Sequence, residues 1–134
     1  MVTWIFIGSL LFTFVFARVI AHSFHDRLNY GTPYEMSKTV TGWLRKRTGF
    51  DLHHYHFGFI IFLFSLIFSY FFEFNTWAII FLGIGTSLLL DQLIFFVSLD
   101  ETYFKVGYFG LNSLLISLIL HLFVALIVIF FYVG

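Results

Sequence analysis

The fold class of this chain is decided by its last apolar segment, GYFGLNSLLISLILHLFVALIVIFFY (residues 107–132), which has no Asp, Glu, Lys or Arg. A helix of roughly 20 apolar residues spans the hydrocarbon core of a bilayer. Three more segments of this kind precede it, at about 3–24, 57–72 and 76–98. Their apolar runs are continuous rather than alternating, which is typical of membrane helices and not of barrel strands. The sequence therefore predicts an all-α integral membrane protein, with residues 1–134 forming a single domain of four transmembrane helices.

The composition supports a lipid environment. Of the 134 residues 60% are hydrophobic and only 10% are charged, whereas an average soluble domain has roughly 25% charged residues. The charges sum to zero, so no excess of basic residues would attract nucleic acid. The chain has no Cys, which excludes disulfides, thiolate chemistry and cysteine-ligated metal sites. We therefore expect the lipid bilayer as the surrounding medium, and neither a soluble enzyme nor a nucleic-acid binder.

The basic residues predict the orientation of the chain in the membrane. Five of the seven lie between the first and second predicted spans, Lys105 lies between the third and fourth, and Arg18 is near the end of the first. Because Lys and Arg mark cytoplasmic connections, both termini and the turn at 73–75 are expected on the non-cytoplasmic side. The first span is interpreted as a retained helix, since it lacks a basic leader and a small-residue cleavage site.

The first connection is expected to contain a helix of its own, at about 33–47. Thr32-Pro33-Tyr34-Glu35 has the pattern of a capping box, with proline at the first helical position. Beyond it, apolar residues and Trp43 follow one stripe while most of the basic residues lie away from it. This pattern favours an amphipathic helix in the cytoplasmic headgroup layer, or else a short helix packed on the end of the bundle.

Each predicted span carries its small and polar residues on one helical face, as close packing of helices in lipid requires. The faces comprise Arg18, His22 and His25; His54, Gly58, Ser65 and Ser69; Gly83, Ser87 and Asp91; and Ser113, Ser117, His121 and Ala125. Arg18 and Asp91 lie at similar depth, so we expect them to form an ion pair. That pair either specifies packing or takes part in function. His121 lies deeper and is expected to be a hydrogen-bonded interhelical histidine more often than a ligand.

Five of the six histidines concentrate at the predicted cytoplasmic rim. His22 and His25 end the first span, and His53, His54 and His56 begin the second. Spacings of three residues place two imidazoles on one side of a helix, where they can share a metal. Asp26 and Asp91 are candidates for a carboxylate ligand or a general base. Nitrogen and oxygen ligands suit Zn²⁺, Fe or Mn. Interfacial or pH-sensing histidines, and haem held by a facing pair, are the alternatives.

Three functions follow from these residues. The first is a small membrane metalloprotein, acting as a metal-dependent enzyme on a lipid or other apolar substrate at the rim. The second is a non-catalytic subunit that forms homo- or hetero-oligomers through its Phe-rich and small-residue helix faces. The third is an ion or proton transporter using Arg18, Asp91 and His121. It ranks last because the chain shows no inverted repeat, and no helix interruption is evident beyond Gly83–Gly85.

Overall fold

Four α-helices make up nearly all of the chain that the computed structural model describes, which comprises residues 1–25, 47, 54–73, 75–93 and 111–133. They are α1 (Val2–His25), α4 (His54–Phe72), α5 (Thr76–Asp91) and α7 (Leu111–Val133). The all-α prediction is therefore confirmed for this part of the chain. The predicted helix at about 33–47 lies outside the described residues, apart from Arg47, which is helical.

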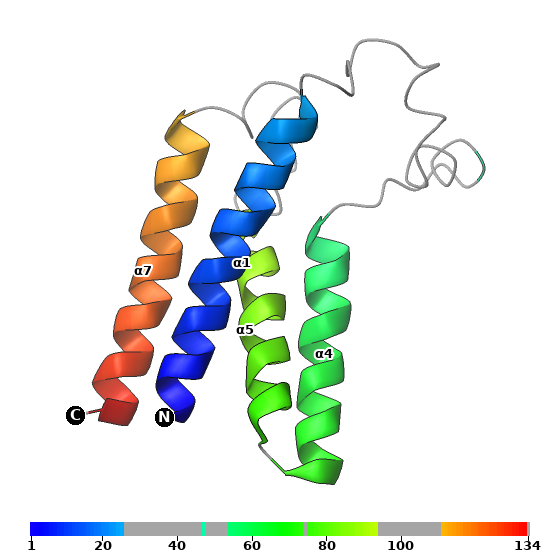
Figure 1. The fold of residues 1–134 in the computed structure, drawn as a ribbon, viewed down its shortest axis with the longest axis vertical. Coiled ribbons are helices and arrows are strands. Elements are labelled where there is room, and N and C mark those ends of the chain that lie inside the picture. The colour runs from blue at the N-terminus through cyan, green and yellow to red at the C-terminus, as the bar shows by residue number, and fades with distance from the viewer. Residues whose placement is uncertain (26–46, 48–53, 74, 94–110, 134) are drawn as a thin grey trace.

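Successive helices run in opposite directions (Figure 1), so both termini and the α4–α5 turn lie at the same end of the molecule. Helix α5 packs against α1 on one side and α4 on the other, while α7 packs against α1 and, more lightly, against α5. Helix α4 thus belongs to the bundle mainly through α5. The arrangement brings the C-terminal end of α1, the N-terminal end of α4 and the N-terminal end of α7 toward the opposite end.

The α4–α5 turn is set by two local features. Glu73 follows the last residue of α4 with φ 63°, the left-handed conformation that commonly ends a helix. Asn75 then caps α5, because its side-chain oxygen accepts a hydrogen bond at 3.0 Å from the backbone N–H of Ala78. That bond satisfies one of the amides that a helix start leaves unpaired. The two helices therefore reverse direction within three residues.

Glycines allow α5 to approach both of its neighbours closely. A Cβ placed on Gly85 would lie 2.7 Å from the backbone nitrogen of Phe62 on α4, and one on Gly58 would lie 3.0 Å from the backbone nitrogen of Leu89 on α5. Gly83 faces Ser9 and the carbonyl oxygen of Phe6 on α1 in the same way. Backbones this close gain dispersion contacts that larger side chains would prevent.

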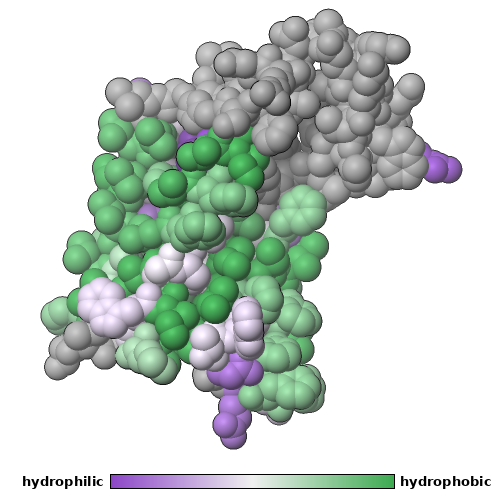
Figure 2. Space-filling model, in the orientation of Figure 1, coloured by the Kyte–Doolittle hydropathy of each residue, from purple (hydrophilic) through white to green (hydrophobic). Residues whose placement is uncertain are grey.

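The burial pattern of these helices is the reverse of that in a soluble bundle. Among the described residues, the buried set contains more polar or charged side chains than apolar ones. Large apolar side chains such as Phe12, Phe64, Leu126 and Phe131 are instead exposed, and the described residues on the face shown in Figure 2 are mostly hydrophobic. Two helical segments, Val2–Ile20 and Asn112–Phe131, are long and apolar enough to cross a membrane, and two shorter apolar helices accompany them.

The third helix differs from the sequence prediction. The predicted span ran to Ser98, whereas α5 ends at Asp91 and Gln92 adopts φ −116° and ψ 10°. Leu93 is helical again, and residues 94–98 lie outside the described residues. The amide of Gln92 bonds back to the carbonyl of Leu89 at 3.3 Å, a tighter closure than the α-helical one. The one candidate interruption in the sequence, Gly83–Gly85, is not a break, because α5 passes through both glycines, and the helix is interrupted instead at Gln92, beside the buried Asp91. The other three helices begin and end within four residues of the predicted bounds.

Candidate functional site

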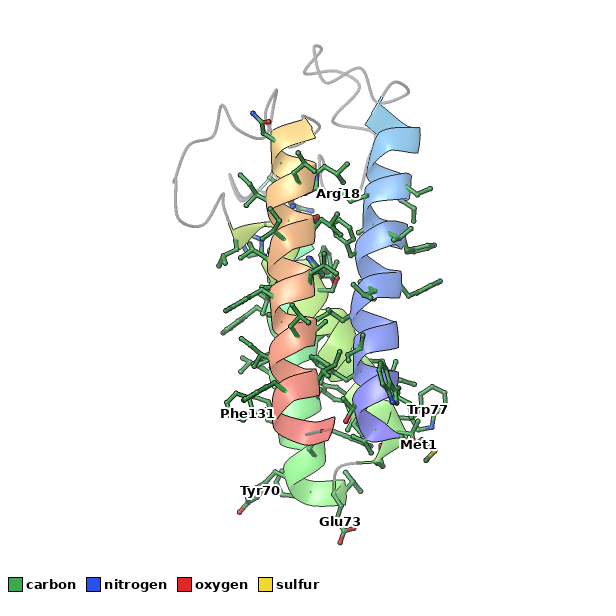
Figure 3. The ribbon with its side chains drawn as sticks, turned by 90° about the vertical axis from the view of Figure 1, so that its left-hand side faces the viewer. Met1, Arg18, Tyr70, Glu73, Trp77 and Phe131 are labelled. Atoms are coloured by element: carbon green, nitrogen blue, oxygen red, sulfur yellow. The ribbon has the colours of Figure 1, made fainter. Side chains whose placement is uncertain are left out.

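Arg18 on α1 and Asp91 at the end of α5 form an ion pair between the helices. The Arg18 Nε donates to Asp91 Oδ1 at 2.7 Å, and the two residues are only 4% and 3% exposed. The pair was expected from equal depth on facing helices. It lies toward one end of the bundle, since Arg18 is far from Met1 and Glu73 at the other (Figure 3). Two charges removed from solvent require this kind of direct contact.

Two serines of α7 extend the ion pair into a network. The Arg18 Nη2 donates to Ser113 Oγ at 3.3 Å, and the Ser117 hydroxyl donates to Asp91 Oδ1 at 2.9 Å. Both serines are buried. Asp91 Oδ1 therefore accepts hydrogen bonds from two helices, α1 and α7, while it belongs to a third. This single oxygen ties together α1, α5 and α7.

One helical turn further along α7, His121 makes a second contact with α5. Its Nδ1 lies 2.7 Å from the carbonyl oxygen of Ser117, and its Nε2 lies 2.9 Å from Ser87 Oγ. A carbonyl oxygen can only accept, so we assign the ring proton to Nδ1. In the neutral imidazole, Nε2 then accepts from the Ser87 hydroxyl. Both ring nitrogens are occupied, so haem ligation by His121 would require the Ser87 contact to open.

The surroundings of His121 decide what this contact can do. The Ser87–His121–carbonyl order matches that of a serine nucleophile, its base and the group that orients the base. However, His121 is 0% exposed and Ser87 is 1% exposed, and the Phe14 ring packs on the imidazole with ring centres 4.5 Å apart. A substrate has no approach to Ser87 in this arrangement, so the contact is an interhelical hydrogen bond, as expected for His121.

The predicted histidine cluster lies mainly beyond what the structure describes. His22 and His25 are in the last turns of α1 and His54 begins α4, but their side chains are not among those described. His53 and Asp26 lie outside the described residues. His56 is part-buried in the first turn of α4. Within the described ranges, no three His, Asp or Glu side chains could hold one metal ion.

Three features of this site were not foreseen from the sequence. Phe14 packs on His121, Gln92 interrupts α5 beside Asp91 and is itself buried, and Ser117 contacts both Asp91 and His121. The spacing of Phe14 and Arg18 by one turn on α1 was a usable signal, because it places Phe14 on the face that carries Arg18. The sequence offers no comparable signal for the break at Gln92.

Comparison with known proteins adds no relative. No protein-family model, curated protein or solved structure matches this chain.

Proposed function

We propose that this chain is an integral membrane protein in which α1, α4, α5 and α7 each form one transmembrane span. The observation that supports it is the reversed burial, with an ion pair and hydroxyls between the helices and large apolar side chains outside. In water this exposed apolar surface would be unfavourable by roughly 25 cal/mol per Å². In lipid it is the expected exterior, and the interior polar groups supply the contacts that hold helices together.

Lengths and interfacial residues agree with this proposal. Helix α4 has 19 residues, or about 28 Å at 1.5 Å per residue, close to the hydrocarbon thickness. Helix α5 has 16 residues, about 24 Å, so residues beyond Asp91 would complete its span. Trp4, Tyr70 and Trp77 are exposed, and the last two lie at the Glu73 end (Figure 3). Exposed Trp and Tyr are enriched where membrane meets water.

The orientation follows from the basic residues of the connections. Six of the seven Lys and Arg residues lie in segments 26–53 and 94–110, which join the helix ends farthest from Glu73. The Arg18–Asp91 end would then face the cytoplasm, with both termini outside. Because the chain has no Cys, a single Glu73→Cys variant can be labelled in intact cells. A membrane-impermeant maleimide is expected to label it, and labelling only after the membrane is opened would reverse the orientation.

The function that the site supports best is a metal-dependent one at the cytoplasmic rim, above the Arg18–Asp91 pair. Asp91 is fixed by two donors where α5 ends, and α1 carries His22 one turn beyond Arg18, with His25 one turn further. Helix α4 begins at His54 in the same end of the bundle. Together with His53, His56 and Asp26, these residues supply a nitrogen and oxygen ligand set suited to Zn²⁺, Fe or Mn.

A divalent metal at the rim would polarise a carbonyl group or activate water at neutral pH. The site would lie at the boundary between the apolar bundle and the cytoplasm, so its substrate would be a lipid or another apolar molecule with a hydrolysable polar group. The basic residues of segment 26–53 would attract an anionic headgroup to this surface. Asp91 or Asp26 would serve as a ligand or as the general base.

The transporter alternative has less support from the contacts. The hydrogen bonds between described helices run from Ser113 to the Ser87–His121 contact. Toward the Glu73 end, buried apolar residues such as Leu10 lie beside buried Ser65 and Ser69, whose hydroxyls bond to carbonyls of their own helix. Among the described residues, the side-chain hydrogen bonds that join helices thus lie toward the Arg18 end, which suits a binding site there more than a conduction path.

The test is the metal content of protein purified in detergent without chelator. We expect about one Zn, Fe or Mn ion per chain, and loss of that ion in the His25→Ala, His53→Ala double variant. Ser65→Ala is the matched control, because its buried hydroxyl bonds only to the carbonyl of Phe62 on its own helix at 2.7 Å. Metal-free wild-type protein would overturn the metal proposal. It would favour the accessory-subunit alternative if native mass spectrometry also found an oligomer.

A further inference from the structure

Two hydrogen bonds between α5 and α7 form a closed ring of four residues. Ser87 and Asp91 are one turn apart on α5, and Ser117 and His121 are one turn apart on α7. The Ser87–His121 contact (2.9 Å) and the Ser117–Asp91 contact (2.9 Å) join the two helices at both levels. Within α7 the ring closes through the Nδ1 of His121 and the carbonyl of Ser117, 2.7 Å apart.

The proton positions in this ring follow from the acceptors. The Ser117 carbonyl accepts from His121 Nδ1–H, so Nε2 of the neutral ring accepts from the Ser87 hydroxyl. The Asp91 carboxylate, paired with Arg18, accepts from the Ser117 hydroxyl. Each donor in the ring has one acceptor, and reversing any single hydrogen bond would leave a buried group unpaired. Such a network holds one arrangement rather than several.

Ser117 links the Ser87–His121 contact to the Asp91 carboxylate. Its carbonyl oxygen accepts from His121 and its hydroxyl donates to Asp91, and the residue is only 1% exposed. A turn of helix is stiff, so a change at the Ser87–His121 level shifts the Ser117 hydroxyl relative to α5. Asp91 Oδ1 also accepts a hydrogen bond from Arg18 Nε at 2.7 Å. The Ser117 hydroxyl is therefore one of the donors that fix the orientation of the Asp91 carboxylate.

From this geometry we infer that Ser87, His121 and Ser117 are positioning residues that orient the Asp91 carboxylate at the end of α5. The inference deepens the proposed function, on which its consequence for metal binding rests. Ser87 and His121 touch neither Asp91 nor the rim histidines in the contacts described, so they act through Ser117. A group that hydrogen-bonds directly to a metal ligand typically changes metal affinity 10- to 100-fold when mutated, and among these three residues that group is Ser117.

The experiment compares Ser87→Ala with Ser65→Ala, two buried serines of which only the first bonds to another helix. The first readout is the side-chain carboxyl ¹³C signal of Asp91 in metal-free protein, assigned with Asp91→Asn. We expect Ser87→Ala to shift this signal and Ser65→Ala to leave it unchanged. An Asp91 signal at the wild-type position in Ser87→Ala would overturn the inference.

A second variant and a second readout complete the experiment. If Ser87→Ala does not fold, Ser87→Cys replaces the hydroxyl with a weaker donor of similar shape, and a smaller shift in the same direction is expected. The second readout is a Zn²⁺ titration, in which Ser117→Ala is expected to weaken binding about 10-fold or more and Ser87→Ala to weaken it by a smaller factor. A shifted carboxyl signal without Zn²⁺ binding to any variant retains the positioning role and overturns the metal proposal alone. Unchanged Zn²⁺ affinity together with an unchanged signal overturns the positioning role.

Discussion

Removing one charge of the Arg18–Asp91 pair should lower the free energy of unfolding far more than removing both charges does. Asp91→Asn keeps the side-chain shape and an acceptor for Ser117, but it leaves the 4%-exposed guanidinium without its counter-charge. Arg18→Met keeps the apolar stem and leaves the carboxylate without its 2.7 Å partner. Breaking a buried pair in this way costs about 3–5 kcal/mol, whereas replacing both members by neutral groups is often close to neutral.

A double-mutant cycle on the free energy of unfolding measures this difference. Each single variant is expected to lose about 3 kcal/mol or more, and the double variant about 1 kcal/mol, which gives a coupling energy of about 5 kcal/mol. Hydrogen bonds between membrane helices average only about 0.6 kcal/mol, so hydroxyl contacts alone cannot supply such coupling.

The assay is unfolding by SDS in mixed micelles, followed by helical circular dichroism. Ser113→Ala is the control, since it removes a hydrogen bond to Arg18 but no charge. Its loss should stay below about 1.7 kcal/mol. If the losses of the two single variants add in the double variant to within about 0.5 kcal/mol, the two charges do not depend on each other and the reasoning is wrong.

Three further predictions concern the packing, the turn and the exterior. Gly85→Ala should lower the unfolding free energy by about 1–3 kcal/mol, because its Cβ would lie 2.7 Å from the backbone nitrogen of Phe62. Gly8→Ala meets nothing within 4 Å and should be neutral or stabilising, so equal effects in the same SDS assay would contradict the close α4–α5 packing. Asn75→Ala should cost about 1 kcal/mol through loss of the cap on Ala78, and an unchanged midpoint would rule the cap out. Phe12 is exposed, so the relaxation of a spin label at this position should be enhanced more by oxygen than by a water-soluble nickel reagent. The opposite order would place this surface in water.

The helix faces and the ion pair could be predicted from the sequence because both depend on simple periodicity. Residues four apart share a face, so the small and polar residues of α5 and α7 were grouped correctly, and Ser87, Asp91, Ser117 and His121 are all buried. Equal depth was enough to pair Arg18 with Asp91. These inferences need no knowledge of how each helix is rotated about its axis.

The details of the network could not be predicted, because they depend on that rotation and on local backbone geometry. Periodicity does not specify that Ser117, rather than Ser113, contacts Asp91, or that Phe14 lies against His121. The interruption at Gln92 was missed because apolar residues continue on both sides of it in the sequence. The helix breaks where a buried carboxylate and a buried amide are adjacent, which is a feature of the tertiary contacts and not of hydropathy.

The metal content of the wild-type chain, purified in detergent without chelator and measured by mass spectrometry of the elements, tests the proposed function most directly. We expect one Zn, Fe or Mn ion per chain, retained in Ser65→Ala and lost in the His25→Ala, His53→Ala double variant. Protein that contains no stoichiometric metal, and acquires none when Zn²⁺, Fe²⁺ or Mn²⁺ is added, would contradict the proposed function.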